Sequence, residues 1–150
     1  MAWTTKLLVI SSRTLTSEAL LTHMLRRAEH APTEFTIVVP GEQSTNGEHL
    51  QGPLRRFRSH GLAVEIRGGD RDPLLAVRDQ WSPSRFDEIV VVTLPTASSR
   101  WLASGLPFRV QQLTGALVTH VVAEAPAGMA RESDDQLAVP VLRTARAVQV

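Results

Sequence analysis

Five short segments of the chain are strongly apolar, and two of them are apolar at almost every position. In Lys6–Ile10 only the first residue is polar, and in Asp87–Val92 only the first two are. A strand that is apolar on both sides must be covered on both faces, as in parallel sheets flanked by helices. Leu62–Ile66 alternates instead, which is typical of an edge strand. We therefore expect strands at Lys6–Ile10, Phe35–Val39, Leu62–Ile66, Asp87–Val92 and Leu117–Val122.

Amphipathic segments with helix start and stop signals separate these runs. Asp72 and Pro73 form a strong start signal, because Asp accepts a free backbone amide and Pro at the first helical position loses no hydrogen bond. Gly61 is placed to end a helix in the left-handed conformation. We expect helices from about Thr16 to Pro32, through Leu50, Leu54 and Phe57, from Asp72 to before Pro83, and from near Ser104 to Leu113 with Gly115 as its stop.

The alternation of five strands with four helices, without repeats or a long linker, predicts an α/β domain. Parallel neighbours need crossover helices, and such crossovers are right-handed, so the pattern favours a doubly wound parallel sheet of strand order 3-2-1-4-5. This is a Rossmann-like three-layer sandwich. We expect the domain to span residues 1–123 and to be followed by a C-terminal extension at residues 124–150.

Composition narrows the classes of partner. The 16 basic and 15 acidic residues give a net charge of +1, whereas nucleic-acid-binding domains usually carry a clear basic excess. The chain has no cysteine, which excludes disulfides, thiol catalysis and thiolate metal sites. The apolar start at Leu7–Ile10 is too short for a membrane span or a signal peptide. We expect a cytoplasmic protein with no nucleic-acid or membrane partner.

In a sheet of this order, ligands bind where the strand order reverses, at the carboxyl ends of the first and fourth strands. The crevice there would bring Ser11–Arg13 close to Thr93–Trp101. The latter segment offers hydroxyl and guanidinium donors for an anion, and the start of the following helix would add a positive dipole end. Each side chain also has a structural interpretation. The serines are typical of turns and helix caps. Arg100 is suited to an ion pair or a dimer contact, and we expect Trp101 to cover the hydrophobic core rather than to stack on a base.

The sequence shows no catalytic constellation. No Gly-x-Ser-x-Gly elbow occurs, and no histidine is tied by spacing to a serine and a carboxylate. His120 lies inside the fifth expected strand, where we expect a structural role, and the other histidines lack the paired spacing of metal ligands. We therefore predict no catalytic residues, no metal site and no certain cofactor. The sequence leaves enzyme activity undecided and favours a protein without it.

Three segments together resemble the universal stress protein family. They are Gly69–Pro73, Phe86–Val92 and the helix-to-strand stretch from Arg109 to Val121. With the Ser-Arg-Trp-Leu and Leu-Pro-Phe-Arg-Val segments, they are most similar to a divergent actinobacterial branch of that family. The resemblance covers the chain from about Lys6 to Val122. It implies the adenine nucleotide alpha hydrolase-like form of the fold, a stress-response role, a homodimer, and ATP or another adenine nucleotide as ligand.

The chain departs from the family's ATP-binding signature in two places. ATP-binding members carry an Asp after the first strand, where this chain has Ser11–Ser12. They also carry Gly-x-x-Gly after the fourth strand, then nine residues and Gly-Ser or Gly-Thr, where this chain has Val92–Pro95 and later Ser104–Gly105. Pro95 has no amide to donate to a phosphate and cannot adopt positive φ. We therefore predict a degenerate nucleotide site composed of Ser11, Ser12, Arg13, Val39, Gly69, Thr93, Thr96, Ser98, Ser99, Arg100, Ser104 and Gly105.

The sequence thus predicts a homodimeric interaction protein with a stress-response role, which dimerises through the fifth strand and the C-terminal extension. The alternative is a module that binds ATP or a small anion through the loop after the fourth strand; a slow nucleotidase is a less favoured third. In the extension, Pro140 restricts Leu137–Leu142 to an edge strand or an extended arm. Packing of this arm on its own subunit or on a neighbour is left open.

Overall fold

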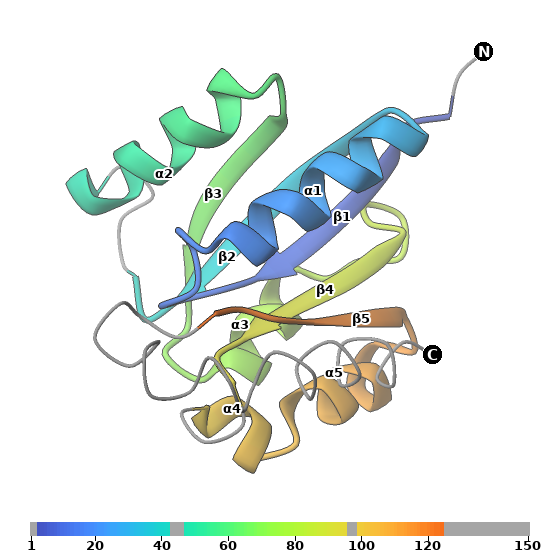
Figure 1. The fold of residues 1–150 in the computed structure, drawn as a ribbon. Coiled ribbons are helices and arrows are strands. Elements are labelled where there is room, and N and C mark those ends of the chain that lie inside the picture. Colours follow the sequence, from blue (N-terminus) through green and yellow to red (C-terminus); the bar gives the residue numbers. More distant parts are fainter. Residues whose placement is uncertain (1–2, 43–46, 96–98, 125–150) are drawn as a thin grey trace.

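A five-stranded, all-parallel sheet forms the centre of the protein. The computed structural model describes residues 3–42, 47–95 and 99–124. Within them the strand order is β3-β2-β1-β4-β5, as the sequence predicts (Figure 1). The order confirms the expected doubly wound α/β fold. The strands are β1 (Thr5–Ile10), β2 (Thr33–Pro40), β3 (Ala63–Gly69), β4 (Glu88–Thr93) and β5 (Leu117–Val122).

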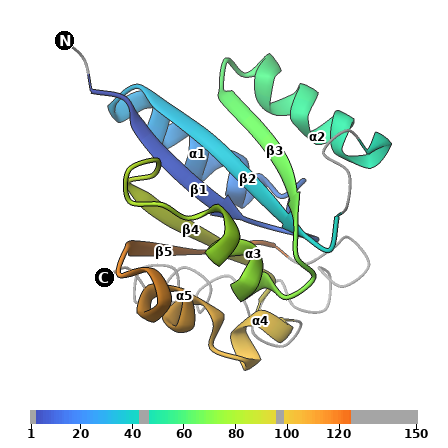
Figure 2. The ribbon, with the colours of Figure 1, turned by 180° about the vertical axis from the view of Figure 1, so that it is seen from behind.

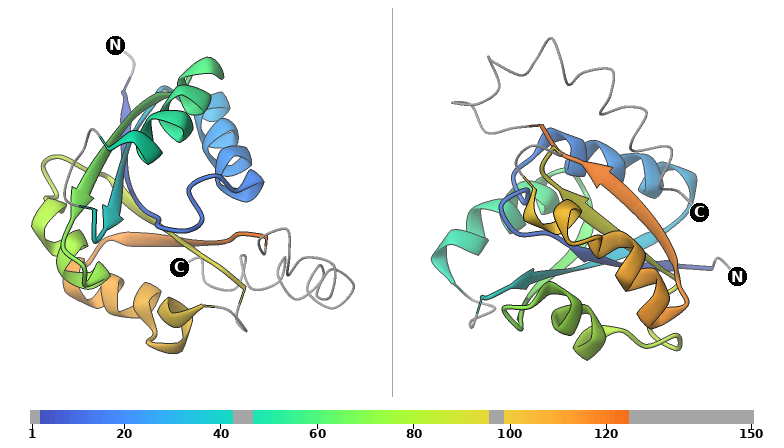
Figure 3. Two further views of the ribbon diagram at one scale, coloured as in Figure 1. Left: turned by 90° about the vertical axis from the view of Figure 1, so that its left-hand side faces the viewer. Right: turned by 90° about the horizontal axis from the view of Figure 1, so that it is seen from below.

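Helices cover both faces of this sheet and complete three layers. One layer contains α1 (Glu18–His30) and α2 (Glu48–Ser59). The opposite layer contains α3 (Pro73–Gln80), α4 (Arg100–Ala103) and α5 (Leu106–Thr114), and Figure 2 shows this side. The left view of Figure 3 shows the sheet between the two layers. Among the described residues, no helix is both long enough and apolar enough to cross a membrane.

The buried strand β1 explains why the fold needs both helical layers. Leu7 and Val9 belong to the core on the α1–α2 side, whereas Leu8 and Ile10 belong to the core on the α3–α5 side. All four side chains are fully buried. Successive side chains of a strand point to opposite faces, so an apolar residue at every position requires cover on both. The continuous apolar run in the sequence is therefore the signature of this central position.

The predicted helix boundaries at Asp72 and Gly61 are confirmed. The Asp72 carboxylate accepts a hydrogen bond from the Leu74 amide at 2.9 Å, and Pro73 occupies the first position of α3. Gly61 has a φ of 80°, which allows the chain to leave α2 in the left-handed conformation. At the start of α1 the cap is Ser17, whose hydroxyl accepts from the Leu20 amide at 3.2 Å.

The helix expected from near Ser104 to Leu113, with Gly115 as its stop, is confirmed as α5, and the structure adds the short helix α4 before it. The four-residue α4 ends before Ser104, and α5 begins at Leu106. Between them Gly105 adopts a left-handed φ of 70°, which turns the chain, and Pro107 lies in the first turn of α5.

Glu124, which follows β5, connects the end of the sheet to the start of α1. Its carboxylate accepts hydrogen bonds from the backbone amides of Glu18 at 2.8 Å and Ala19 at 3.4 Å. A negative charge at this position satisfies amides that have no partner inside the helix. The remainder of the predicted extension, residues 125–150, lies outside the described residues.

Candidate functional site

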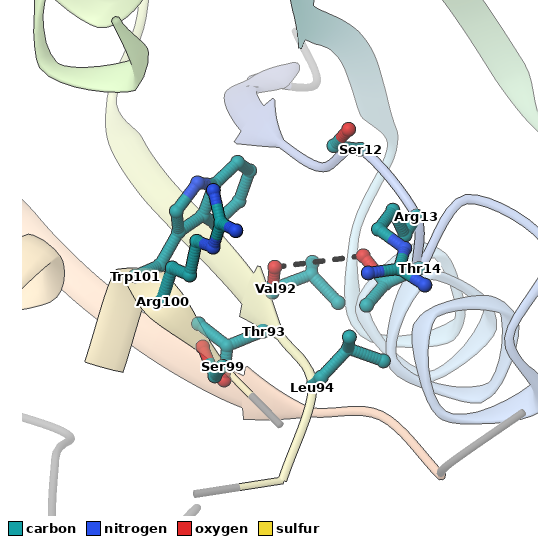
Figure 4. Close-up of a pocket in the computed structure, with 9 residues that line it drawn as sticks. All are labelled: Ser12, Arg13, Thr14, Val92, Thr93, Leu94, Ser99, Arg100 and Trp101. Atoms are coloured by element: carbon teal, nitrogen blue, oxygen red, sulfur yellow. Dashed lines mark hydrogen bonds between the residues drawn. The ribbon is translucent and has the colours of Figure 1, made fainter. Parts of the chain in front are cut away.

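A pocket lies at the carboxyl ends of β1 and β4, which is where the strand order reverses. It has a volume of about 350 Å³ and is drawn in Figure 4. β1 leads into a turn that runs to α1, and β4 leads toward α4 on the other side of the sheet, so the two chain segments diverge and leave a hollow between them. The lining residues are Ser12, Arg13, Thr14, Val92, Thr93, Leu94, Ser99, Arg100 and Trp101.

The turn after β1 is fixed by two buried hydroxyl groups. The Ser11 and Thr14 hydroxyl oxygens are 2.7 Å apart, and Thr14 also donates a long 3.5 Å hydrogen bond to the Val92 carbonyl of β4 (dashed line in Figure 4). Ser11 is fully buried and lies behind the pocket wall, so its predicted site role becomes a structural one. The two hydroxyls hold the turn against β4, which positions Ser12 and Arg13 at the pocket.

Two arginines give the pocket its charge. Arg13 lies on one side in Figure 4 and Arg100 on the other, and both are exposed. Neither forms a hydrogen bond or an ion pair with any of the described residues. No Asp or Glu is among the described residues that line the pocket. The hollow is therefore electropositive and offers guanidinium donors that the described chain itself does not satisfy.

The floor of the pocket contains a hydrogen-bonded pair that the sequence did not reveal. The Thr93 hydroxyl lies 2.7 Å from Nε2 of His120, and both residues are buried. Val91 pairs with His120 across the sheet, so Thr93, two residues further along β4, shares a face with it. Only the register of β4 against β5 shows that the two residues are neighbours, and this register can be derived only once the strand order is known.

His120 is held neutral by its surroundings. Burial lowers the pKa of its imidazole from 6.5 to about 4. Nδ1 has no hydrogen-bond partner among the described residues. The expected position inside β5 is confirmed, and no carboxylate of the described residues is hydrogen-bonded to the ring, as the base of a nucleophile would require. The described residues also contain no group of three acidic, histidine or cysteine side chains arranged for a metal ion.

Trp101 and Ser99 each combine a structural role with a place in the pocket. Trp101 is half-buried, packs against the core on the α3–α5 side and lines the pocket beside Arg100. Ser99 caps α4, since its hydroxyl oxygen accepts from the Leu102 amide at 3.0 Å. The capping interpretation of Ser99 is therefore correct, and its hydroxyl proton is still available to a ligand.

Three other predicted site residues lie away from this pocket. Ser104 donates a hydrogen bond to the Trp101 carbonyl at 3.0 Å, and Gly105 forms the turn between the two helices. Gly69 packs against α3 and β2: a Cβ added there would lie 3.0 Å from the Ala76 Cβ and 2.9 Å from Val38 Cγ1. Its small size serves close packing. Thr96 and Ser98 lie outside the described residues.

A second pocket of about 340 Å³ shares Ser12 and Arg13 with the first. It lies toward β2, and Val39, the remaining predicted site residue, is in its wall. Arg13 thus borders both hollows. The other lining residues are Leu15, Thr16, Pro40, Gly41, Glu42, His49, Leu50 and Pro53.

The chain was also compared with known proteins. No protein-family model matches it, and no curated protein matches its sequence. The universal stress protein family therefore stays a prediction that rests on the segments described above and on the compatible fold.

Proposed function

We propose that this protein is a binding module for a small anionic ligand, an adenine nucleotide or a related phosphate compound, in the pocket between β1 and β4. The observation that carries the proposal is the pair Arg13 and Arg100, which flank the pocket and have no partner among the described residues. A cytoplasmic stress-response role of the universal stress type is the biological setting that fits this proposal, supported by the sequence resemblance and the shared strand order.

The chemistry of the pocket favours an anion. A guanidinium group presents a rigid fork of N–H donors that matches phosphate and carboxylate oxygens. The hydroxyls of Ser12 and Ser99 add neutral donors, and no described residue that lines the pocket has a carboxylate. A volume of about 350 Å³ lies at the small end of the range for ligand sites, roughly 300–1,000 Å³.

The proposal is tested by isothermal titration calorimetry with ATP, AMP and inorganic phosphate on the full chain, with and without magnesium. We expect saturable binding of at least one of these anions. Arg13→Gln and Arg100→Gln should each weaken it at least tenfold. Arg109→Gln is the matched control, because Arg109 is exposed on α5 and does not line the pocket. Absence of saturable binding at millimolar concentrations, or equal weakening by the control, contradicts the proposal.

A second candidate function is self-association through β5, as the sequence-based prediction has it. The outer edge of β5 has no strand partner among the described residues, and Leu117–Val122 contains no Asp, Glu, Lys or Arg. Leu113 and Leu117, beside this edge, are each 45% exposed. Unprotected strand edges are templates for pairing with another chain.

Light scattering of the full chain after size-exclusion chromatography tests this second candidate. We expect a dimer that Leu117→Lys converts to a monomer. Ala63→Lys is the matched control, because Ala63 is the exposed first residue of β3, at the opposite edge of the sheet. A wild-type monomer at all concentrations, or a dimer that both variants leave intact, would exclude an interface at this edge.

A further inference from the structure

We propose that the anionic group binds at the turn after β1, on the backbone amides of Ser12, Arg13 and Thr14, and that the ligand is a phosphate monoester bound without magnesium. This inference rests on the proposed anion-binding function and makes it specific. It assigns the cradle to the β1 side of the pocket, whereas the sequence resemblance points to the loop after β4.

The turn after β1 contains three consecutive amides without partners. The Ser11 amide donates to the Val38 carbonyl at 3.2 Å, and the Leu15 amide donates to the Ser12 carbonyl at 3.3 Å. Between them, the amides of Ser12, Arg13 and Thr14 make no hydrogen bond within the described part of the chain. Successive N–H groups of a turn that have no protein partner can form an anion-binding concavity.

The neighbouring start of α1 is already filled by the protein itself. Ser17 caps the Leu20 amide, and the Glu124 carboxylate accepts from the amides of Glu18 and Ala19. An incoming anion would have to displace Glu124 to bind in the first turn of α1. The donors that are still open therefore lie in the preceding turn, and that turn lines the pocket.

The β4 side supplies the opposite wall of the pocket. Pro95 has no amide, and the Thr93 hydroxyl is bonded to His120. This side contributes the Arg100 guanidinium, the flat wall of Trp101, and the backbone amides of Arg100 and Trp101 in the first turn of the four-residue α4. An anion on the turn amides would thus be enclosed by Arg13 from its own turn and by Arg100 from the opposite wall.

The charges of the pocket select the ligand class. A phosphate monoester carries about −1.5 to −2 charges at pH 7, which matches two guanidinium groups. Magnesium-bound triphosphates need carboxylate or comparable oxygen ligands for the metal, and no described pocket residue supplies a carboxylate. Trp101 provides a surface on which a planar organic group of the ester can stack. A nucleoside monophosphate and a simpler phosphate ester share this chemistry.

Amide NMR of the ¹⁵N-labelled full chain at pH 7 tests the inference, with inorganic phosphate, AMP and magnesium-ATP as probes at constant ionic strength. We expect phosphate and AMP to shift the amide signals of Ser12, Arg13 and Thr14 most, in a saturable manner that chloride does not reproduce. Arg13→Gln and Arg100→Gln should each raise the Kd at least tenfold, while Arg109→Gln leaves it within twofold.

The outcomes separate the two proposals. Saturable binding whose largest shifts fall on residues 99–105 overturns the assignment to the turn and leaves the binding module standing. Tighter binding of magnesium-ATP than of AMP overturns the ligand class alone. If none of the three probes binds, the binding function and this inference fail together.

Discussion

The Thr93 hydroxyl of β4 lies 2.7 Å from the imidazole Nε2 of His120 on β5, and this contact joins the pocket floor to the edge strand of the sheet. Both groups are buried, so neither can exchange its partner for bulk water. A buried polar atom that loses its partner retains its desolvation cost, roughly 1–3 kcal/mol. The pair is therefore a structural requirement of this part of the fold.

Removing one member of this pair should cost more than removing both. We expect Thr93→Val to lower the free energy of unfolding by about 1–3 kcal/mol, because Nε2 then loses the one partner that the described residues give it. The double variant Thr93→Val with His120→Leu should recover most of that loss, since no polar group remains unpaired. Urea denaturation of the two single variants and the double variant measures the coupling. Simple additivity of the two single effects would contradict this account.

Stability should fall on mild acidification because of two histidines. Burial lowers the pKa of His120 to about 4, and burial together with Arg27 and Arg26 lowers that of His23 to about 4, against the raising effect of Glu88. In the unfolded chain both titrate near 6.5, so between pH 6.5 and 4 the unfolded state binds more protons. The contribution of these two histidines to the free energy of unfolding is fully present above pH 6.5 and is lost as the pH falls toward 4.

The size of this acid effect can be measured by variants. A one-unit pKa shift corresponds to about 1.4 kcal/mol, and after allowing for solvent screening we expect roughly 2 kcal/mol from each histidine. Urea denaturation at several pH values between 7 and 4 should show the decline. His23→Leu and His120→Leu should each make it shallower. An unchanged slope in the double variant would assign the decline to other groups.

Gly68 should tolerate no side chain. A Cβ at this position would lie 2.0 Å from the Glu42 carbonyl oxygen, so Gly68→Ala must displace the chain that follows β2. We expect a loss of about 1–3 kcal/mol, which thermal or urea denaturation would detect. Gly52→Ala is the control: nothing lies within 4 Å of a Cβ there, and the position is inside α2. This control should cost less than Gly68→Ala, because Pro53 disfavours but does not exclude a side chain at the preceding helical residue. Equal effects of the two substitutions would disprove the close approach.

Glu124 should stabilise α1 from outside the helix. Glu124→Ala removes the carboxylate that accepts from the amides of Glu18 and Ala19, and we expect a loss of about 1 kcal/mol. Because part of the effect is the attraction between a charge and the helix terminus, it should shrink at high salt. Urea denaturation at low and high sodium chloride measures it. A loss that is identical at both salt concentrations would mean that the charge makes no contribution.

The sheet could be predicted from the sequence because its strands follow from local patterns. Runs such as Lys6–Ile10 need two covered faces, and the alternation with helices leaves few ways to connect the strands. The signals at Asp72 and Gly61 act within a few residues and were read correctly. The position of the pocket followed in turn from the strand order.

Features that depend on contacts between distant segments could not be predicted in this way. Thr93 and His120 are 27 residues apart, and only the register of β4 and β5 brings them together. Gly69 looked like a residue that approaches a ligand, but its neighbours are Val38 and Ala76. The short helix α4 could not be predicted either, because its four residues, Arg100–Ala103, are too few to show a helical repeat of apolar positions.

The two edge strands of the sheet differ in charge, and this difference limits the size of any assembly that forms through them. At the β3 edge, Glu65 and Arg67 are ion-paired and Arg58 donates a hydrogen bond to the Val64 carbonyl at 3.2 Å. The β5 edge carries no such charges. If two copies join β5 to β5, the combined sheet ends in a charged β3 strand on each side. Association would then close after one step instead of propagating into a fibre.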